Sequence, residues 1–153
     1  MKEQLNPKFI VGFTDTETVM LDFDGMPFRS AKYWAERIRR RFRLGGFLIM
    51  KSSENNYHVV FDRPVSWAEN MSIVAWAALT THSRPLERWL VMQCIKKSST
   101  LRVSKKGKKP SPRIVFSYGT RDRQVFSFQK HRRLIKNIIK RSELNQISEE
   151  IPI

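Results

Sequence analysis

The chain is poor in cysteine and contains no long hydrophobic run. Its single cysteine, Cys94, excludes an intramolecular disulfide framework and any multi-cysteine zinc or iron–sulfur site. Because Cys94 lies in an apolar stretch, we expect it to pack as a small hydrophobic residue. No apolar run approaches the roughly 18 residues that a membrane span needs, and residues 1–6 lack the apolar core of a signal peptide. These absences predict a soluble, cytoplasmic protein with no membrane partner.

Acidic residues are almost missing from residues 96–141. This segment holds 16 lysines and arginines and one acid, Asp122, whereas the rest of the chain has 13 basic and 13 acidic residues. The whole net charge of +15 therefore comes from this segment. A solvated basic surface is usually interleaved with acids, so the one-sided charge predicts an anionic partner. Nucleic acid is favoured over an acidic membrane surface, because no broad aromatic stripe accompanies the basic residues.

The chain is long enough to bury a core of its own. Its 153 residues are 41% hydrophobic and 11% aromatic, which is typical of one folded domain. We predict a single domain over residues 1–141 and a flexible C-terminal tail over residues 142–153.

Strands are predicted where apolar and polar residues alternate and β-branched or aromatic residues are frequent. They are expected over residues 8–13, 16–24, 47–50, 57–61, 100–103 and 113–118. Polar turns at 14–15 and at Asn55-Asn56 join the first two pairs, and the second pair forms a hairpin. The basic loop 104–112 separates the last two strands.

Helices are predicted where apolar residues recur every three to four positions. They are expected over residues 30–43 with Ser30 as the N-cap, over 66–80 behind a capping box at Ser66 and Glu69, and over 123–141. Residues 86–95 fit a helix or a strand equally well. This order predicts an α+β fold, an antiparallel or mixed sheet with an RRM-like half and helices packed on one face.

Two aspartates alternate with apolar residues on the second predicted strand. Asp22 and Asp24 project from one face, whereas Leu21 and Phe23 project from the other. The two carboxylates lie about 7 Å apart along a strand and repel each other unless a cation lies between them. Hard oxygen ligands of this kind suit Mg²⁺ or Mn²⁺. A lone Asp-x-Asp is also compatible with a polar strand end that enters the turn at Gly25.

His58 lies on the second strand of the predicted hairpin, between Tyr57 and Val59. A histidine on a strand is often a structural residue whose hydrogen bonds are satisfied locally. Beside an acid pair, however, His58 becomes a candidate ligand for a nucleotide phosphate.

In this order the motifs resemble the catalytic core of the archaeo-eukaryotic primase superfamily, especially the small primase-polymerase domains of archaeal plasmids and viruses. The resemblance covers residues 19–116 and includes Asp22-Phe-Asp24, Asn56-Tyr57-His58 and the basic stretch from Leu101 to Lys105. It implies that the acids bind divalent metal and that the histidine contacts a nucleoside triphosphate. The family carries a third acid shortly before the arginine, but residues 91–95 contain none. The resemblance therefore implies either a minimal nucleotidyltransferase that makes primers or a relative with reduced catalysis.

The resemblance and the one-sided basic charge together assign a role to each candidate residue. Asp22 and Asp24 are the expected metal ligands and, with His58, the expected catalytic residues. The nucleotide is expected to contact Ser53, Asn56, His58, Arg102 and Lys105. The nucleic acid is expected to contact Lys106, Lys108, Lys109, Arg113, Arg132 and Arg133. The sequence leaves open whether Glu87, Asp62 or a partner chain such as another replication subunit supplies the missing negative charge.

Three other interpretations stay open at this point. Residues 19–25 also resemble the nucleophile motif of haloacid-dehalogenase-like phosphatases, although no late acidic pair follows a strand. A rolling-circle nicking enzyme would need two histidines flanking an apolar residue, and the histidines here are isolated. A non-enzymatic DNA- or RNA-binding accessory protein would use aromatic residues on the sheet and a flexible basic loop to bind nucleic acid.

Overall fold

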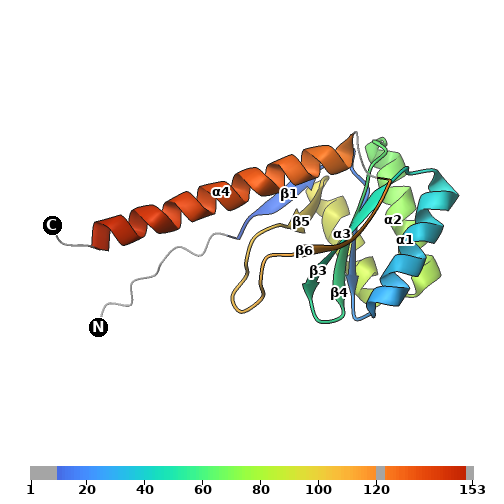
Figure 1. The fold of residues 1–153 in the computed structure, drawn as a ribbon. Coiled ribbons are helices and arrows are strands. Elements are labelled where there is room, and N and C mark those ends of the chain that lie inside the picture. Colours follow the sequence, from blue (N-terminus) through green and yellow to red (C-terminus); the bar gives the residue numbers. More distant parts are fainter. Residues whose placement is uncertain (1–9, 120–122, 151–153) are drawn as a thin grey trace.

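Two antiparallel sheets form the centre of the computed structural model, which describes residues 10–119 and 123–150, and only the backbone of 143–150 (Figure 1). The strands are β1 (Gly12–Asp15), β2 (Met20–Asp24), β3 (Phe47–Ser53), β4 (Asn56–Phe61), β5 (Ser99–Arg102) and β6 (Arg113–Tyr118). β1 and β5 form a two-stranded sheet, and the other strands form a four-stranded sheet in the order β2-β4-β3-β6. The two strands that the sequence joins by a turn at 14–15 therefore lie in different sheets, and so do β5 and β6, the strands on either side of the basic loop.

The helices are α1 (Phe28–Phe42), α2 (Trp67–Thr81), α3 (Arg84–Lys96) and α4 (Gln124–Glu150). The succession β2-α1-β3-β4-α2, with β4 between β2 and β3, gives the RRM-like half that the sequence predicted. Together the elements confirm the α+β fold class. Within the described residues, no helix has the length and hydropathy needed to cross a bilayer.

The first core lies between the four-stranded sheet and helices α1 and α2. Leu21 and Phe23 of β2 are fully buried there, and they pack with Val59 and Phe61 of β4 and with residues such as Ile38 of α1. Each large apolar side chain buried in this way contributes roughly 1.5–3 kcal/mol of transfer free energy. This burial determines which face of β2 is turned inward and leaves Asp22 and Asp24 on the other face.

A second, smaller core covers part of the opposite sheet face. Met20 and Met50 pack there against Phe13 of β1, Leu101 of β5 and Phe128 of α4. α4 thus packs on the face opposite α1 and α2, and Figure 1 shows it projecting beyond the two sheets. The cover ends before the C-terminal end of β2 is reached, so this end stays accessible.

Several predicted boundaries differ from the structure. α1 begins after Pro27, whose carbonyl accepts hydrogen bonds from the backbone of Ser30 and Ala31, so Ser30 is not the N-cap. The ambiguous residues 86–95 are helical, because Ser83 caps α3 and Pro85 lies in its first turn. α4 continues to Glu150, so the predicted tail is helical up to that residue, and 151–153 lie outside the described residues. Cys94 is exposed rather than packed.

Candidate functional site

The pairing of β2 with β4 brings together the residues that carry the two motifs. Asp22 lies opposite His58, and Asp24 lies opposite Asn56. Because side chains alternate along a strand, Asp22, Asp24, Asn56 and His58 share one sheet face. His58 is only 6% exposed, and its Nε2 atom lies 3.4 Å from Oδ1 of Asp22. The structure therefore places the acid pair and the imidazole side by side.

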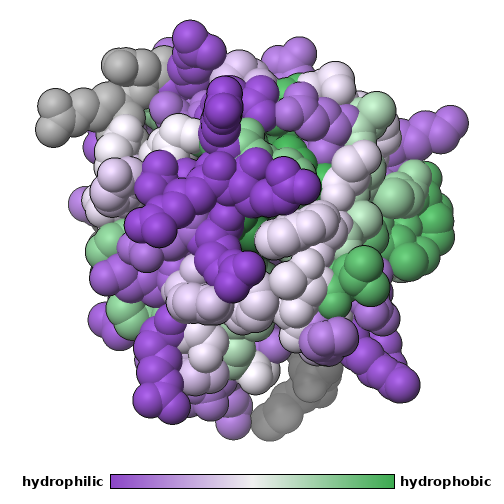
Figure 2. Space-filling model, turned by 90° about the vertical axis from the view of Figure 1, so that its right-hand side faces the viewer, coloured by the Kyte–Doolittle hydropathy of each residue, from purple (hydrophilic) through white to green (hydrophobic). Residues whose placement is uncertain are grey.

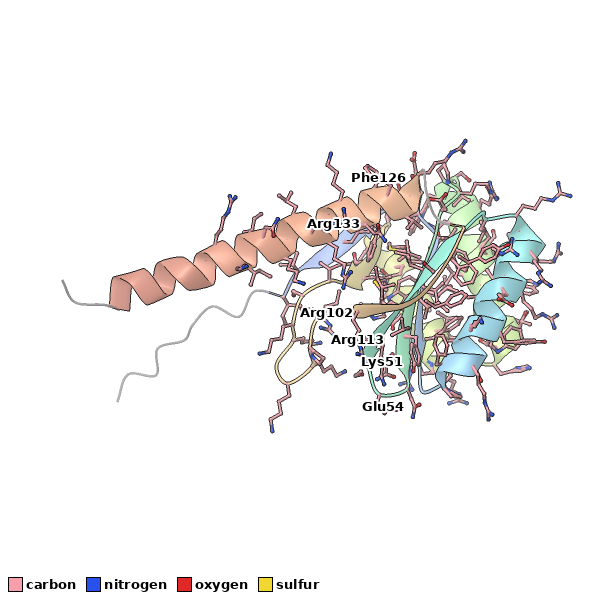
Figure 3. All side chains as sticks on the ribbon, in the orientation of Figure 1. Lys51, Glu54, Arg102, Arg113, Phe126 and Arg133 are labelled. Carbon is pink, nitrogen blue, oxygen red and sulfur yellow. The ribbon has the colours of Figure 1, made fainter. Side chains whose placement is uncertain are left out.

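These residues line an open cleft with a volume of about 310 Å³. Its walls come from β2, β3, β4, β5 and the loop between β5 and β6. The lining residues are Asp22, Asp24, Ser52, Asn56, His58, Thr100, Leu101, Arg102, Lys106 and Lys109. Figure 3 shows Arg102, Arg113 and Lys51 on the side where this loop leaves the body. The cleft thus combines two carboxylates and an imidazole with three cationic side chains.

The two carboxylates strongly influence each other. Burial, the charge of Asp22 and a hydrogen bond with Asp22 raise the pKa of Asp24 from 3.8 to about 6, against the opposing effects of His58 and Lys109. Oδ1 of Asp22 and Nδ1 of His58 are buried and lack a hydrogen-bond partner. The 3.4 Å contact of Asp22 with Nε2 of His58 therefore does not satisfy this oxygen as a hydrogen bond would. A buried, unsatisfied carboxylate oxygen beside a second carboxylate is a favourable place for a cation.

Arg102 connects the cleft to the loop that follows β5. Its Nη1 donates hydrogen bonds to the carbonyl oxygens of Ser104 and of Pro110, the latter at 3.0 Å. Burial lowers the pKa of Arg102, and the Asp22 carboxylate opposes this effect. Within the loop, Lys106 and Lys109 exchange two backbone hydrogen bonds of 3.0 and 2.9 Å around Gly107. This tight turn, called the basic turn below, brings the Lys106 and Lys109 side chains to the cleft.

Hydrogen bonds around Asn56 join the hairpin to the turn after β2. Its Oδ1 accepts a hydrogen bond from the backbone of Gly25 at 3.1 Å, and its Nδ2 donates one to Oγ of Ser53 at 2.6 Å. Ser53 therefore supports Asn56 from outside the cleft lining. Ser52, which points to the other side of β3, lines the cleft instead. Alternation of side chains along β3 could have indicated that Ser52, and not Ser53, faces the cleft. The irregular register between Lys51 and Ser53 makes this alternation hard to recognise in the sequence.

The structure distributes the predicted nucleic-acid ligands over three elements. Lys106 and Lys109 line the cleft, whereas Lys105 and Lys108 are exposed residues of the same loop outside the lining. Arg113 begins β6 and pairs with Lys51 of β3. On α4, Arg133 is exposed, and Nη2 of Arg132 donates a hydrogen bond to the carbonyl of Pro112 at 2.8 Å. Burial and the neighbouring Arg133 lower the pKa of Arg132. Arg132 thus restrains the end of the loop, whereas the interpretation as a non-enzymatic binding protein predicts a flexible loop.

Neither residue considered as a source of a third acid lines the cleft. Oδ1 of Asp62 accepts hydrogen bonds from the backbone of Arg123 and Val125, both at 3.2 Å, and so caps the start of α4. Glu87 lies in the first turn of α3. Among the described residues, no three His, Cys, Asp or Glu side chains are arranged to hold a metal ion. Two carboxylates with an unsatisfied oxygen are ligands of the kind that one hard divalent cation prefers.

Comparisons with family models, with curated proteins and with solved structures find no match to this chain.

Proposed function

We propose that the protein is a primase-like replication protein that binds a nucleoside triphosphate with a divalent cation and binds nucleic acid beside it. One observation carries this proposal, namely that Asp22, Asp24 and His58 line the same cleft as Arg102, Lys106 and Lys109. Carboxylates alone would repel a triphosphate, and cations alone would not require an acid pair. The combination fits an Mg²⁺- or Mn²⁺-bound triphosphate.

The residues of the cleft suggest a division of tasks. Asp22 and Asp24 would hold the cation, whose charge would offset that of the phosphates and polarise the phosphoryl group. His58 would contact a phosphate beside the cation at Asp22, and its ring is kept in place because β4 is buried between β2 and β3. Arg102 would contribute charge from a position fixed by the loop carbonyls. Lys106 and Lys109 would reach the phosphates from the basic turn.

Whether the cleft also joins nucleotides depends on the charge that holds the metal. Two-metal phosphoryl transfer requires carboxylates for two dications, and two carboxylates suit one. We propose a minimal primer-synthesising nucleotidyltransferase, located in the cytoplasm and working with other replication subunits, of which one supplies the further acid.

Primer synthesis with labelled nucleotides and Mn²⁺ tests this proposal. We expect Asp22→Asn/Asp24→Asn to abolish incorporation and to remove cation-dependent triphosphate binding measured by calorimetry. The matched control is Glu17→Gln/Glu54→Gln, which removes the same charge from exposed positions outside the cleft and should behave as wild type. Equal triphosphate binding by the cleft variant and the wild type would refute the proposal.

The second candidate is a non-enzymatic DNA- or RNA-binding accessory protein. It is favoured by the lack of a third acid among the described residues that line the cleft. Salt-sensitive nucleic-acid binding by the wild type, with neither triphosphate binding nor incorporation, would select this function.

A further inference from the structure

A second concentration of positive charge lies on α1, on the other side of the four-stranded sheet from the cleft. Residues 28–43 contain one acid, Glu36, and seven basic residues, which are Arg29, Lys32, Arg37, Arg39, Arg40, Arg41 and Arg43. The inner side of the helix packs through Ala31, Ala35 and Ile38 on the sheet face opposite Asp22. Figure 2 views the molecule from the side of α1 and shows hydrophilic side chains gathered over this face.

The exposed side chains of α1 form a continuous stripe. Arg29, Tyr33, Arg37 and Arg41 are exposed and follow one another at intervals of four residues, with Arg40 beside them. The stripe is about 18 Å long at 1.5 Å per residue, a length comparable to about five nucleotide steps of one strand in a duplex. Among the described residues, no basic side chain of α1 forms an ion pair with a carboxylate.

The stability of the helix does not explain this arrangement. Basic residues in the last turn of a helix complement its dipole, and this applies to Arg39, Arg40 and Arg41. Arg29, however, lies in the first turn, where the dipole favours an acid and none is present. Arg37 and Arg41 also repel each other at a spacing of four residues. The charge is therefore unfavourable for the isolated protein and would be relieved by a polyanion.

The chemistry of the stripe favours nucleic acid over an anionic membrane. Arg37 donates a hydrogen bond to the hydroxyl of Tyr33 at 2.9 Å, and its guanidinium lies 5.7 Å and 5.6 Å from the ring centroids of Tyr33 and Trp34. Guanidinium groups bind phosphates in a bidentate manner, and an exposed tyrosine can stack on a base. A membrane-binding helix would expose leucine, isoleucine or phenylalanine, whereas the one large exposed hydrophobic residue of α1 is Tyr33.

We propose that α1 is a second nucleic-acid-binding surface, which holds the phosphate backbone of a strand that extends beyond the cleft. Side-chain contacts join α1 to β6, because Lys32 lies over the ring of Phe116 and Arg39 lies over the ring of Tyr118. β6 is the edge strand that begins with Arg113. Arg113 pairs with Lys51, which precedes the cleft residue Ser52, so a nucleic-acid strand that leaves the cleft along this edge would reach α1 beside Lys32 and Arg39. This inference rests on the proposed function in one respect, which is that the partner is a nucleic acid.

Arg37→Gln/Arg40→Gln/Arg41→Gln tests the surface, because glutamine preserves helix propensity and removes charge. The matched control is Arg84→Gln/Arg88→Gln/Lys97→Gln, which removes three exposed charges from α3 and its C-cap. Binding is measured by fluorescence anisotropy against salt, with labelled single-stranded DNA of about 30 nucleotides, longer than the roughly 4–16 that one small domain covers. We expect the slope of log K against log salt to fall by about two in the α1 variant, since each contact on a single strand contributes roughly 0.7. The control should keep the wild-type slope.

Equal slopes in the two variants, with circular dichroism showing intact helices, would overturn the inference. So would unchanged DNA binding combined with lost binding to phosphatidylserine vesicles, because that result would assign the stripe to a membrane. Failure of the cleft proposal gives a different result, in which triphosphate binding is absent from the wild type while the α1 variant still shows the reduced DNA slope.

Discussion

Asp24 should control how strongly the cleft binds a divalent cation below neutral pH. Its pKa is raised to about 6 by burial and by the charge of Asp22. A cation that needs both carboxylates ionised must displace the proton of Asp24, so its affinity falls as the pH falls through 6. About nine in ten Asp24 side chains are ionised at pH 7 and about one in ten at pH 5. The apparent dissociation constant for Mn²⁺ should therefore rise about ten-fold over this range.

Isothermal titration calorimetry with Mn²⁺ at pH 7, 6 and 5 measures this change. An aspartate with the ordinary pKa of 3.8 would change the affinity by less than about 10% over the same range. Because His58 lies 3.4 Å from Asp22, the titration is repeated in His58→Gln, where a change in imidazole charge cannot contribute. An affinity that stays flat from pH 7 to 5 in both proteins would refute the coupling between the two carboxylates.

The same pKa determines how Asp24 affects folding stability. The folded protein binds the proton of Asp24 more tightly than the unfolded chain does, so stability falls as the pH rises from about 4 to about 6. Asp24→Asn should thus unfold at a higher urea concentration than wild type at pH 7.5, and the difference should vanish below about pH 4. A variant that is less stable than wild type at pH 7.5 would contradict the assigned direction of the shift.

Three further changes test the parts of the fold that position the cleft. Asn70→Ala removes two 3.0 Å hydrogen bonds that the buried side chain donates to the carbonyls of Thr16 and Thr18. It should lower the free energy of unfolding, measured with urea, by about 2–4 kcal/mol. Asn137→Ala, at an exposed position, is the control and should leave that free energy almost unchanged. Gly46→Ala places a Cβ against the carbonyl of Tyr118 and against Gly119. It should therefore destabilise the pairing of β3 with β6 by about 1–3 kcal/mol. An unchanged midpoint of urea unfolding would show that β6 shifts freely. Arg132→Ala removes the hydrogen bond to the carbonyl of Pro112. Trypsin should then cut the loop 104–112 several-fold faster than it does in the control Arg133→Ala. Equal cleavage rates would mean that α4 does not hold the loop.

The parts of the fold that sequence patterns predicted are local. The capping hydrogen bond from Glu69 N–H to Ser66 and the left-handed backbone of Asn55 each depend on a few neighbouring residues. The shared face of Asp22 and Asp24 follows from strict alternation with Leu21 and Phe23. A hairpin then places His58 on the same sheet, so these three residues could be grouped before any coordinates were known.

The parts that were not predicted depend on contacts distant in sequence. β1 pairs with β5 so that Gly12 lies opposite Arg102, and no pattern within either segment specifies that partner. Gly12 is required there, because a Cβ would lie 2.5 Å from Cγ2 of Thr100. Asp62 is another case, since it follows β4 in the sequence but its side chain caps α4. Local alternation could not reveal either role.

These distant contacts decide which basic residues reach the cleft. In sequence the loop after β5 presents Lys105, Lys106, Lys108 and Lys109 as equivalent charges. Arg102 donates hydrogen bonds to the carbonyls of Ser104 and Pro110 in this loop. The backbone hydrogen bonds between Lys106 and Lys109 then direct the side chains of these two lysines to the acid pair. Because Arg102 also lies near Asp22, one arginine connects the position of the basic turn to the charge of the carboxylates. Neutralising Asp22 should therefore affect the loop as well as the cation, a coupling that composition alone does not indicate.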